Sequence, residues 1–115
     1  MLKPEYKEKK ERTYKVHPEN RKIYVRINHR SQIKVPLFMD NTKGKRMKAV
    51  YIGNDMVKCT TTRDSDTERE YSTIISISPT MRKVLGMQKN EWFEIMIIDD
   101  GYMLRKATAE ELDFE

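Results

Sequence analysis

Basic side chains are concentrated in the first part of this 115-residue chain, where strand-like sequence begins. The densest set on such sequence is Arg21, Lys22, Arg26, Arg30 and Lys34. Guanidinium and ammonium groups at this density are suited to phosphate oxygens, whose contacts fix a protein on a nucleic acid. The alternative for the same residues is a solvated polar face with no ligand.

A second basic cluster surrounds Gly44 and contains Lys43, Lys45, Arg46 and Lys48. A glycine loop lets backbone N–H groups approach an anion, so this cluster is also a candidate phosphate site. An ordinary hairpin connection would have the same composition, and that alternative stays open.

Two tyrosines accompany the basic residues, and they add a further possibility. Tyr14 and Tyr24 could stack on bases, as aromatic side chains do in proteins that bind single-stranded nucleic acid. Packing inside the protein is the more ordinary role, and an RNA-binding module is the weakest of the functions considered.

The remaining reactive residue types do not form a catalytic or metal-binding set. The two histidines, His17 and His29, lie in an arm and a loop, and no Ser-His-Asp order or phosphate-binding P-loop is present. Cys59 is expected to be a small buried hydrophobe, and Asp99-Asp100 a turn. We therefore expect no enzyme activity, no metal and no cofactor.

Charge is distributed unevenly along the chain. Residues 1–48 contain 15 Lys and Arg against 5 Asp and Glu, a net charge of +10, whereas the rest contains 8 against 13, a net charge of −5. Such asymmetry favours a polyanionic partner, with double-stranded DNA the commonest. The mean hydropathy is −0.83 and no run of about 18 apolar residues occurs, so no membrane span is expected. The N-terminal residues lack an apolar signal region, which predicts a cytoplasmic protein.

Alternation and turn residues predict a mainly β chain in five segments. These are a flexible basic arm (1–20), a first hairpin unit (21–60), a linker (61–71), a second hairpin unit (72–108) and an acidic tail (109–115). In the first predicted strand, Tyr24, Arg26 and Asn28 alternate with the apolar residues and are assigned to the outward face. The second unit also predicts one short helix, which Ser78 caps and Gly86 ends.

The two units share one order of parts, which indicates an internal repeat. IKVPLFMDNTKGKRMKAVYIGNDMVKC runs parallel to ISISPTMRKVLGMQKNEWFEIMIIDDGYMLRK. Ile33 aligns with Ile75 at an offset of 42, and Ala49 aligns with Ile95 at an offset of 46. The first unit therefore lacks about one helical turn. Since about 40 residues cannot close a core alone, the two units are expected to pair.

The second unit resembles the swapped-hairpin units of the AbrB/MazE/SpoVT family of transcription regulators. The matching motifs are Ile77-Ser78, Arg82-Lys83-Val84-Leu85-Gly86-Met87, Asn90-Glu91, Phe93 to Ile98, Asp100-Gly101 and Leu104-Arg105. In the first unit only Ile33-Lys34-Val35-Pro36, Lys43-Gly44 and the hairpin from Val50 to Lys58 match. The resemblance implies a small swapped-hairpin β-barrel, here a tandem pseudo-dimer within one chain.

The resemblance also implies DNA binding through basic residues on one face. The family's basic pair at the helix start falls on Arg82 and Lys83, whereas the equivalent residues of the first unit are Asp40 and Asn41. The basic residue that precedes the family's first strand falls on Gln32 and Ile74, so neither unit matches there.

Charge and resemblance together predict a DNA-binding transcriptional regulator that contacts duplex phosphates through its basic half. The acidic second half favours an alternative: a protein-interaction module, either antitoxin-like or an inhibitor of a host enzyme such as a polymerase or nuclease. The expected assembly is a monomeric pseudo-dimer or a homodimer.

Overall fold

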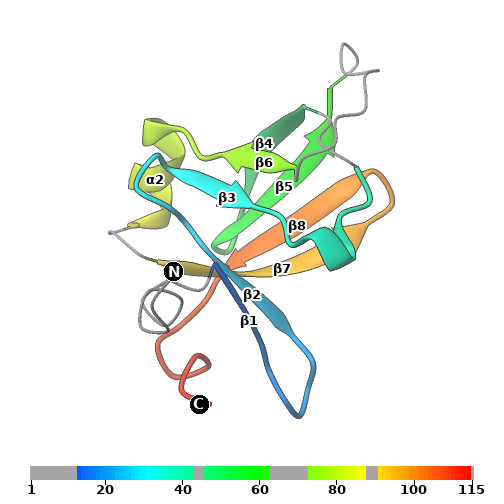
Figure 1. Ribbon diagram of the computed structural model, residues 1–115. Coiled ribbons are helices and arrows are strands. Elements are labelled where there is room, and N and C mark those ends of the chain that lie inside the picture. Colours follow the sequence, from blue (N-terminus) through cyan, green and yellow to red (C-terminus); the bar gives the residue numbers. More distant parts are fainter. Residues whose placement is uncertain (1–12, 43–45, 63–72, 88–90, 115) are drawn as a thin grey trace, which may run out of the picture.

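Period-two alternation of apolar side chains generates most of the regular structure, which a computed structural model describes over residues 13–42, 46–62, 73–87 and 91–114 (Figure 1). The strands are β1 (Tyr14–Val16), β2 (Ile23–Arg26), β3 (Gln32–Lys34), β4 (Met47–Gly53), β5 (Met56–Thr61), β6 (Ile74–Ser76), β7 (Trp92–Ile98) and β8 (Gly101–Lys106). A 3-10 turn, η1 (Leu37–Met39), and a helix, α2 (Pro79–Leu85), complete the described elements. The prediction of a mainly β fold is confirmed.

The strands hydrogen-bond as two sheets. Six of them form an antiparallel sheet in the order β1-β2-β7-β8-β5-β4, and β3 pairs with β6 in a two-stranded ribbon. The ribbon crosses one face of the larger sheet, with α2 at one end of it (Figure 1). Within the described residues, the two sheets do not join into one closed barrel.

The core lies between the ribbon and the larger sheet. Its buried apolar side chains are Val25, Ile27, Ile33, Val35, Met39, Val57, Cys59, Ile75, Ile77, Leu85, Phe93, Ile95, Tyr102 and Leu104. Burial of one such aliphatic or aromatic side chain contributes about 1.5–3 kcal/mol, so both units depend on this shared core. Cys59 is buried, as predicted, and burial raises the pKa of its thiol to about 12, which keeps the thiol protonated at neutral pH.

The hairpins β4–β5 and β7–β8 have equivalent registers. Ala49 pairs with Cys59, and Ile95 pairs with Leu104. This register agrees with the sequence alignment of Ala49 on Ile95 at an offset of 46. Equivalent residues of the return strands β5 and β8 are 45 residues apart, one fewer than in β4 and β7. The difference arises because β4 has a bulge between Tyr51 and Gly53 that holds one extra residue.

Two further pairings relate the units to each other. In β5–β8, Lys58 lies opposite Met103, and in β3–β6, Ile33 lies opposite Ile75. The register is reciprocal, since Gln32 pairs with Ser76 and Lys34 with Ile74. Reciprocal pairing of equivalent residues is the pattern that a two-fold rotation between two similar units produces.

The predicted helix has the predicted ends. The Ser78 side chain accepts a hydrogen bond from the Met81 N–H, Pro79 is the first helical residue, and Gly86 adopts the left-handed conformation with φ of 64°. The first unit has the shorter turn η1 at the corresponding place, which accounts for the difference between the offsets of 42 and 46.

The structure corrects two of the predicted segments. The arm predicted over 1–20 is wrong for residues 13–20, because β1 pairs with β2 and His17 starts the turn between them; residues 1–12 lie outside the described residues. The tail predicted over 109–115 is also wrong for its described part, because the chain around Glu111 packs against the large sheet. Most of the predicted linker, residues 63–72, lies outside the described residues.

The described ranges contain neither a candidate membrane-spanning helix nor a candidate metal site. No helix in these ranges is long and apolar enough to cross a membrane. No group of three or more His, Cys, Asp or Glu residues in the same ranges is placed to hold a metal ion.

Candidate nucleic-acid interface

The loop between β2 and β3 holds Arg30 at the surface. Asn28 organises the loop, because its Oδ1 accepts hydrogen bonds from the backbone N–H groups of Arg30, at 2.8 Å, and Gln32, at 3.0 Å. Ser31 follows with φ of 59°, a left-handed conformation that turns the chain into β3. Arg30 is therefore an exposed cation on an ordered loop.

Helix α2 adds the basic pair of the second unit to this loop. Arg82 Nη1 donates a hydrogen bond of 2.7 Å to Ser31 Oγ, directly beside Arg30. Lys83, the next residue, is exposed, whereas Leu85 faces the core. The fold thus joins cations that are about fifty residues apart in the sequence.

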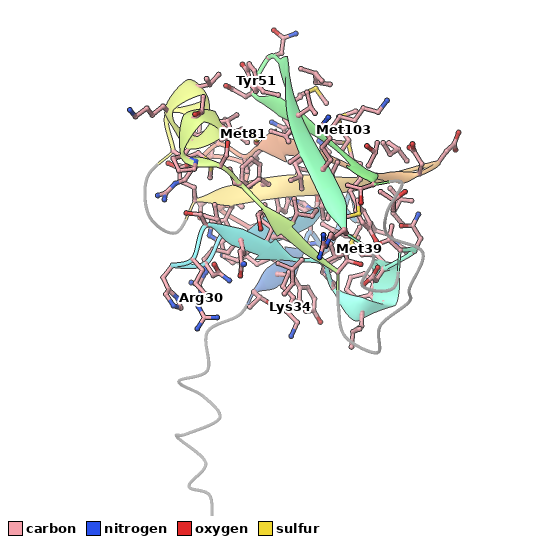
Figure 2. The ribbon with its side chains drawn as sticks, turned by 90° about the horizontal axis from the view of Figure 1, so that it is seen from above. Arg30, Lys34, Met39, Tyr51, Met81 and Met103 are labelled. Carbon is pink, nitrogen blue, oxygen red and sulfur yellow. The ribbon has the colours of Figure 1, made fainter. Side chains whose placement is uncertain are left out.

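Lys34 extends this basic region along the ribbon. It is exposed at the end of β3, and its neighbour Ile33 is buried, as alternation requires. Figure 2 shows Arg30 and Lys34 projecting from the same side of the molecule, with Tyr51 on the opposite side. We call Arg30, Lys34, Arg82 and Lys83 the ribbon basic set.

The position equivalent to Arg82 in the first unit carries Asp40, at the offset of 42 that relates β3 to β6. Equivalence is supported by two matching backbone bonds of 2.9 Å, from Val35 N–H to Thr73 O and from Ile77 N–H to Ser31 O. Arg82 contacts Ser31, and Asp40 contacts Thr73, which is the counterpart of Ser31.

Asp40 has an extensive set of hydrogen bonds. Its carboxylate accepts from the Thr73 N–H at 2.8 Å, the Thr73 hydroxyl at 2.8 Å, the Tyr102 hydroxyl at 2.9 Å and the Thr42 N–H at 3.0 Å. Burial acts to raise the pKa of Asp40, but these hydrogen bonds outweigh it and hold the pKa below its ordinary value. Asp40 is a structural carboxylate, so the basic region has no counterpart at this position.

The other predicted basic residues lie apart from the ribbon basic set. Arg21 and Lys22 lie at the far end of the β1–β2 hairpin, where Lys22 Nζ is 4.0 Å from Glu94 Oε1. The Arg26 guanidinium lies 5.8 Å from the centre of the Trp92 ring. Arg46 is exposed just before β4. Lys43 and Lys45 lie outside the described residues.

The outward orientation predicted for Tyr24 is wrong. Its side chain is 1% exposed, and its hydroxyl donates a hydrogen bond of 3.3 Å to Glu111 Oε2. Burial, together with Glu111, raises the pKa of this phenol. Strand alternation correctly placed Tyr24 on the second face of β2, but it could not show that the C-terminal residues cover that face. Because Tyr24 is buried there, it is not available for base stacking.

An ion-pair network holds the C-terminal residues against the sheet. Arg105 Nη2 donates to Glu94 Oε1 at 2.8 Å and to Glu111 Oε2 at 2.6 Å. Thr108 and Glu111 exchange the reciprocal bonds of a capping box, which their spacing predicts. The Phe114 ring then contacts His17, with ring centres 4.6 Å apart. Sequence reasoning missed this packing, although the capping box signalled its start.

Comparisons of the chain with models of known protein families, with curated proteins and with solved structures find no match.

Proposed function

We propose that this protein is a DNA-binding regulator that grips duplex phosphates with the ribbon basic set. The observation that carries the proposal is the Arg82–Ser31 hydrogen bond, which places the basic pair of α2 beside the loop that holds Arg30. Cations from both units then form one region, and phosphate contacts of this kind position a protein on DNA. The proposal involves binding alone, with no catalytic step.

We further propose that the two units form a single-chain version of the swapped-hairpin arrangement of AbrB-like regulators. The reciprocal registers of β3–β6 and β5–β8 support this proposal, as do the matched registers of the two hairpins. The asymmetry between Arg82 and Asp40 means that DNA would be contacted chiefly at one end of the pseudo-two-fold arrangement.

The acidic character of the second half does not oppose this assignment. Glu94 and Glu111 are both paired with Arg105, and Glu91 Oε2 lies 3.7 Å from Lys106 Nζ. The turn between β7 and β8, which holds Asp99-Asp100, lies at the opposite end of the molecule from α2 (Figure 1). These carboxylates are therefore ion-paired with basic side chains or distant from the ribbon basic set.

The test is binding of a labelled random-sequence duplex, measured by fluorescence anisotropy over a salt series. Micromolar or tighter binding with a steep salt dependence is expected, because phosphate contacts release counterions. The double variant Arg30→Ala/Lys34→Ala should bind at least about tenfold more weakly, with a log–log salt slope smaller by about 2.

The matched control is Lys48→Ala/Lys58→Ala, which removes two exposed lysines from β4 and β5. The net charge changes equally in both variants, so any difference reports the location of the contacts. Equal weakening in the two variants would mean that the ribbon basic set does not control binding, because total charge or the second basic cluster, which contains Lys48, would account for the loss. Absence of binding by the wild-type chain at about 50 mM salt would exclude the proposed function.

A further inference from the structure

The β1–β2 hairpin projects from the body of the molecule (Figure 1), and large apolar side chains of β1 and of η1 are exposed. Tyr14 and Val16 of β1 are 42% and 44% exposed, and Leu37 and Phe38 of η1 are 72% and 61% exposed. The Tyr14 and Phe38 rings are in contact, with centres 5.5 Å apart. We call these four residues the η1 groove residues; the contact between Tyr14 and Phe38 joins the two elements from which they come.

A pocket adjoins the η1 groove residues. A cavity of about 370 Å³ lies between β1 and η1, lined by Thr13 and Tyr14 on one side and by residues 34–38 on the other. Large apolar side chains that gather around a concavity mark binding surfaces, because a lone soluble chain gains nothing by exposing them together.

The free edge of β1 borders the same pocket. The Arg26 N–H donates to Thr13 O and the His17 N–H donates to Lys22 O, so residues 13 and 17 bond toward β2. By antiparallel alternation, the backbone groups of Tyr14 and Val16 point away from β2. Among the described residues, no strand pairs with this edge. An added strand can therefore bond to β1 while its alternate side chains reach the η1 groove residues.

Charge identifies the class of partner. Lys15 lies between Tyr14 and Val16 on the other face of β1, where its ammonium also lies 5.0 Å from the centre of the Trp92 ring. A second copy of this chain, pairing antiparallel through the outward backbone groups of its own Tyr14 and Val16, would place its Lys15 opposite this Lys15, and like charges placed side by side on paired strands are destabilising. A strand that carries carboxylates next to its apolar residues has the opposite effect.

We propose that the edge of β1 and the η1 groove residues bind an extended segment of another protein in which acidic and apolar residues alternate. The apolar side chains fill the pocket beside Tyr14 and Phe38, and the carboxylates, on the opposite face of the added strand, lie near Lys15. This inference goes beyond DNA binding and does not depend on it.

The probe for the test is a labelled nine-residue peptide with Glu at odd positions and Val or Phe at even positions. The control peptide has the same composition, with its apolar residues grouped at one end. Fluorescence anisotropy with the full-length chain should show the alternating peptide binding at least tenfold more tightly than the control. Equal affinity for the two peptides would overturn the proposal, because attraction by charge alone would then explain the binding.

Two variants locate the site. Leu37→Ser/Phe38→Ser should weaken binding of the alternating peptide at least tenfold. Val16→Pro, which removes an outward N–H from the edge of β1, should weaken the same binding at least fivefold. The control Val50→Ser/Ile52→Ser changes two exposed apolar residues of β4 and should leave the affinity within twofold. Unchanged affinity in Leu37→Ser/Phe38→Ser would contradict the assignment.

Light scattering and DNA binding separate the remaining possibilities. A mass of twice the chain that reverts to one chain in Leu37→Ser/Phe38→Ser would identify a second copy as the occupant, and would overturn the proposal. The same variant should keep the duplex affinity of the wild type, because Leu37 and Phe38 do not belong to the ribbon basic set. Failure of the peptide proposal is therefore distinguishable from failure of the DNA proposal.

Discussion

At the scale of single residues, Asp40 and Arg82 show how two equivalent positions have taken different roles. Arg82 is half-buried, and within the described part of the chain its side chain makes one hydrogen bond, to Ser31, which leaves most of its guanidinium donors for an anion. Asp40 instead ties η1 to Thr73 and Tyr102. A charge that is committed to internal hydrogen bonds stabilises the fold, whereas one at the surface is available to a ligand.

Replacement of Asp40 by alanine should destabilise the protein by about 3 kcal/mol, because the buried hydroxyls of Thr73 and Tyr102 lose their acceptor. Urea unfolding of Asp40→Ala measures the loss. The control Asp99→Ala removes the same charge from an exposed turn and should change the stability by less than about 0.5 kcal/mol. Equal effects in the two variants would mean that the Asp40 hydrogen bonds contribute little.

Glu111 gives the protein an acid-sensitive contact. Its hydrogen bonds with Arg105 lower its pKa from 4.5 to about 2 in the folded chain. A lowered folded-state pKa stabilises the protein above the unfolded value, and this stabilisation is lost as the pH falls from about 4.5 to about 2. Because both side chains are partly exposed, we expect a contribution of about 1.5 kcal/mol.

Stability curves between pH 6 and pH 2 measure this contribution. In Glu111→Gln, the fall in stability below pH 4.5 should be smaller than in the wild type by that amount. Glu110→Gln is the control, since Glu110 is exposed beside it. If Glu110→Gln flattens the curve as much as Glu111→Gln does, the contact with Arg105 is not the source of the acid sensitivity.

At the scale of elements, the β5–β8 pairing holds the two units together, and Gly101 permits it. A Cβ on Gly101 would lie 1.9 Å from the Cys59 carbonyl oxygen of the neighbouring strand. The turn predicted at Asp99-Asp100 is at those residues, and Gly101 is the first residue of β8. The requirement for glycine at 101 arises from the approach of a strand that belongs to the other unit.

Gly101→Ala should therefore lower the free energy of unfolding by about 3 kcal/mol, as measured with urea, because the backbone must move to admit the methyl group. Gly53→Ala is the comparison, since Gly53 has φ of 97° but nothing within 4 Å of an added Cβ. Its cost should be near 1 kcal/mol, from backbone conformation alone. A smaller loss for Gly101→Ala than for Gly53→Ala would contradict the close approach of β5 and β8.

At the scale of the whole molecule, tertiary structure separates the basic residues of the first half. Among the described residues, Arg30 and Lys34 belong to the ribbon basic set, Arg21 lies at the end of the β1–β2 hairpin, Arg26 lies beside Trp92 and Arg46 precedes β4. The salt-series comparison between Arg30→Ala/Lys34→Ala and Lys48→Ala/Lys58→Ala is a test at this scale, because it asks whether location or total charge controls DNA binding.

Local sequence determined the strands after β1, the turns between them and the capped helix, because these depend on alternation, on Gly and Asn at turns, and on Ser78 and Pro79 at the helix start. It also determined the repeat, since the alignment of Ile33 with Ile75 is the register of β3 with β6. Tertiary structure alone decided that Tyr24 is buried, that Arg82 reaches Ser31 and that Leu37 and Phe38 stay open. Each of these depends on which distant segment packs against a residue, and neither periodicity nor composition contains that information.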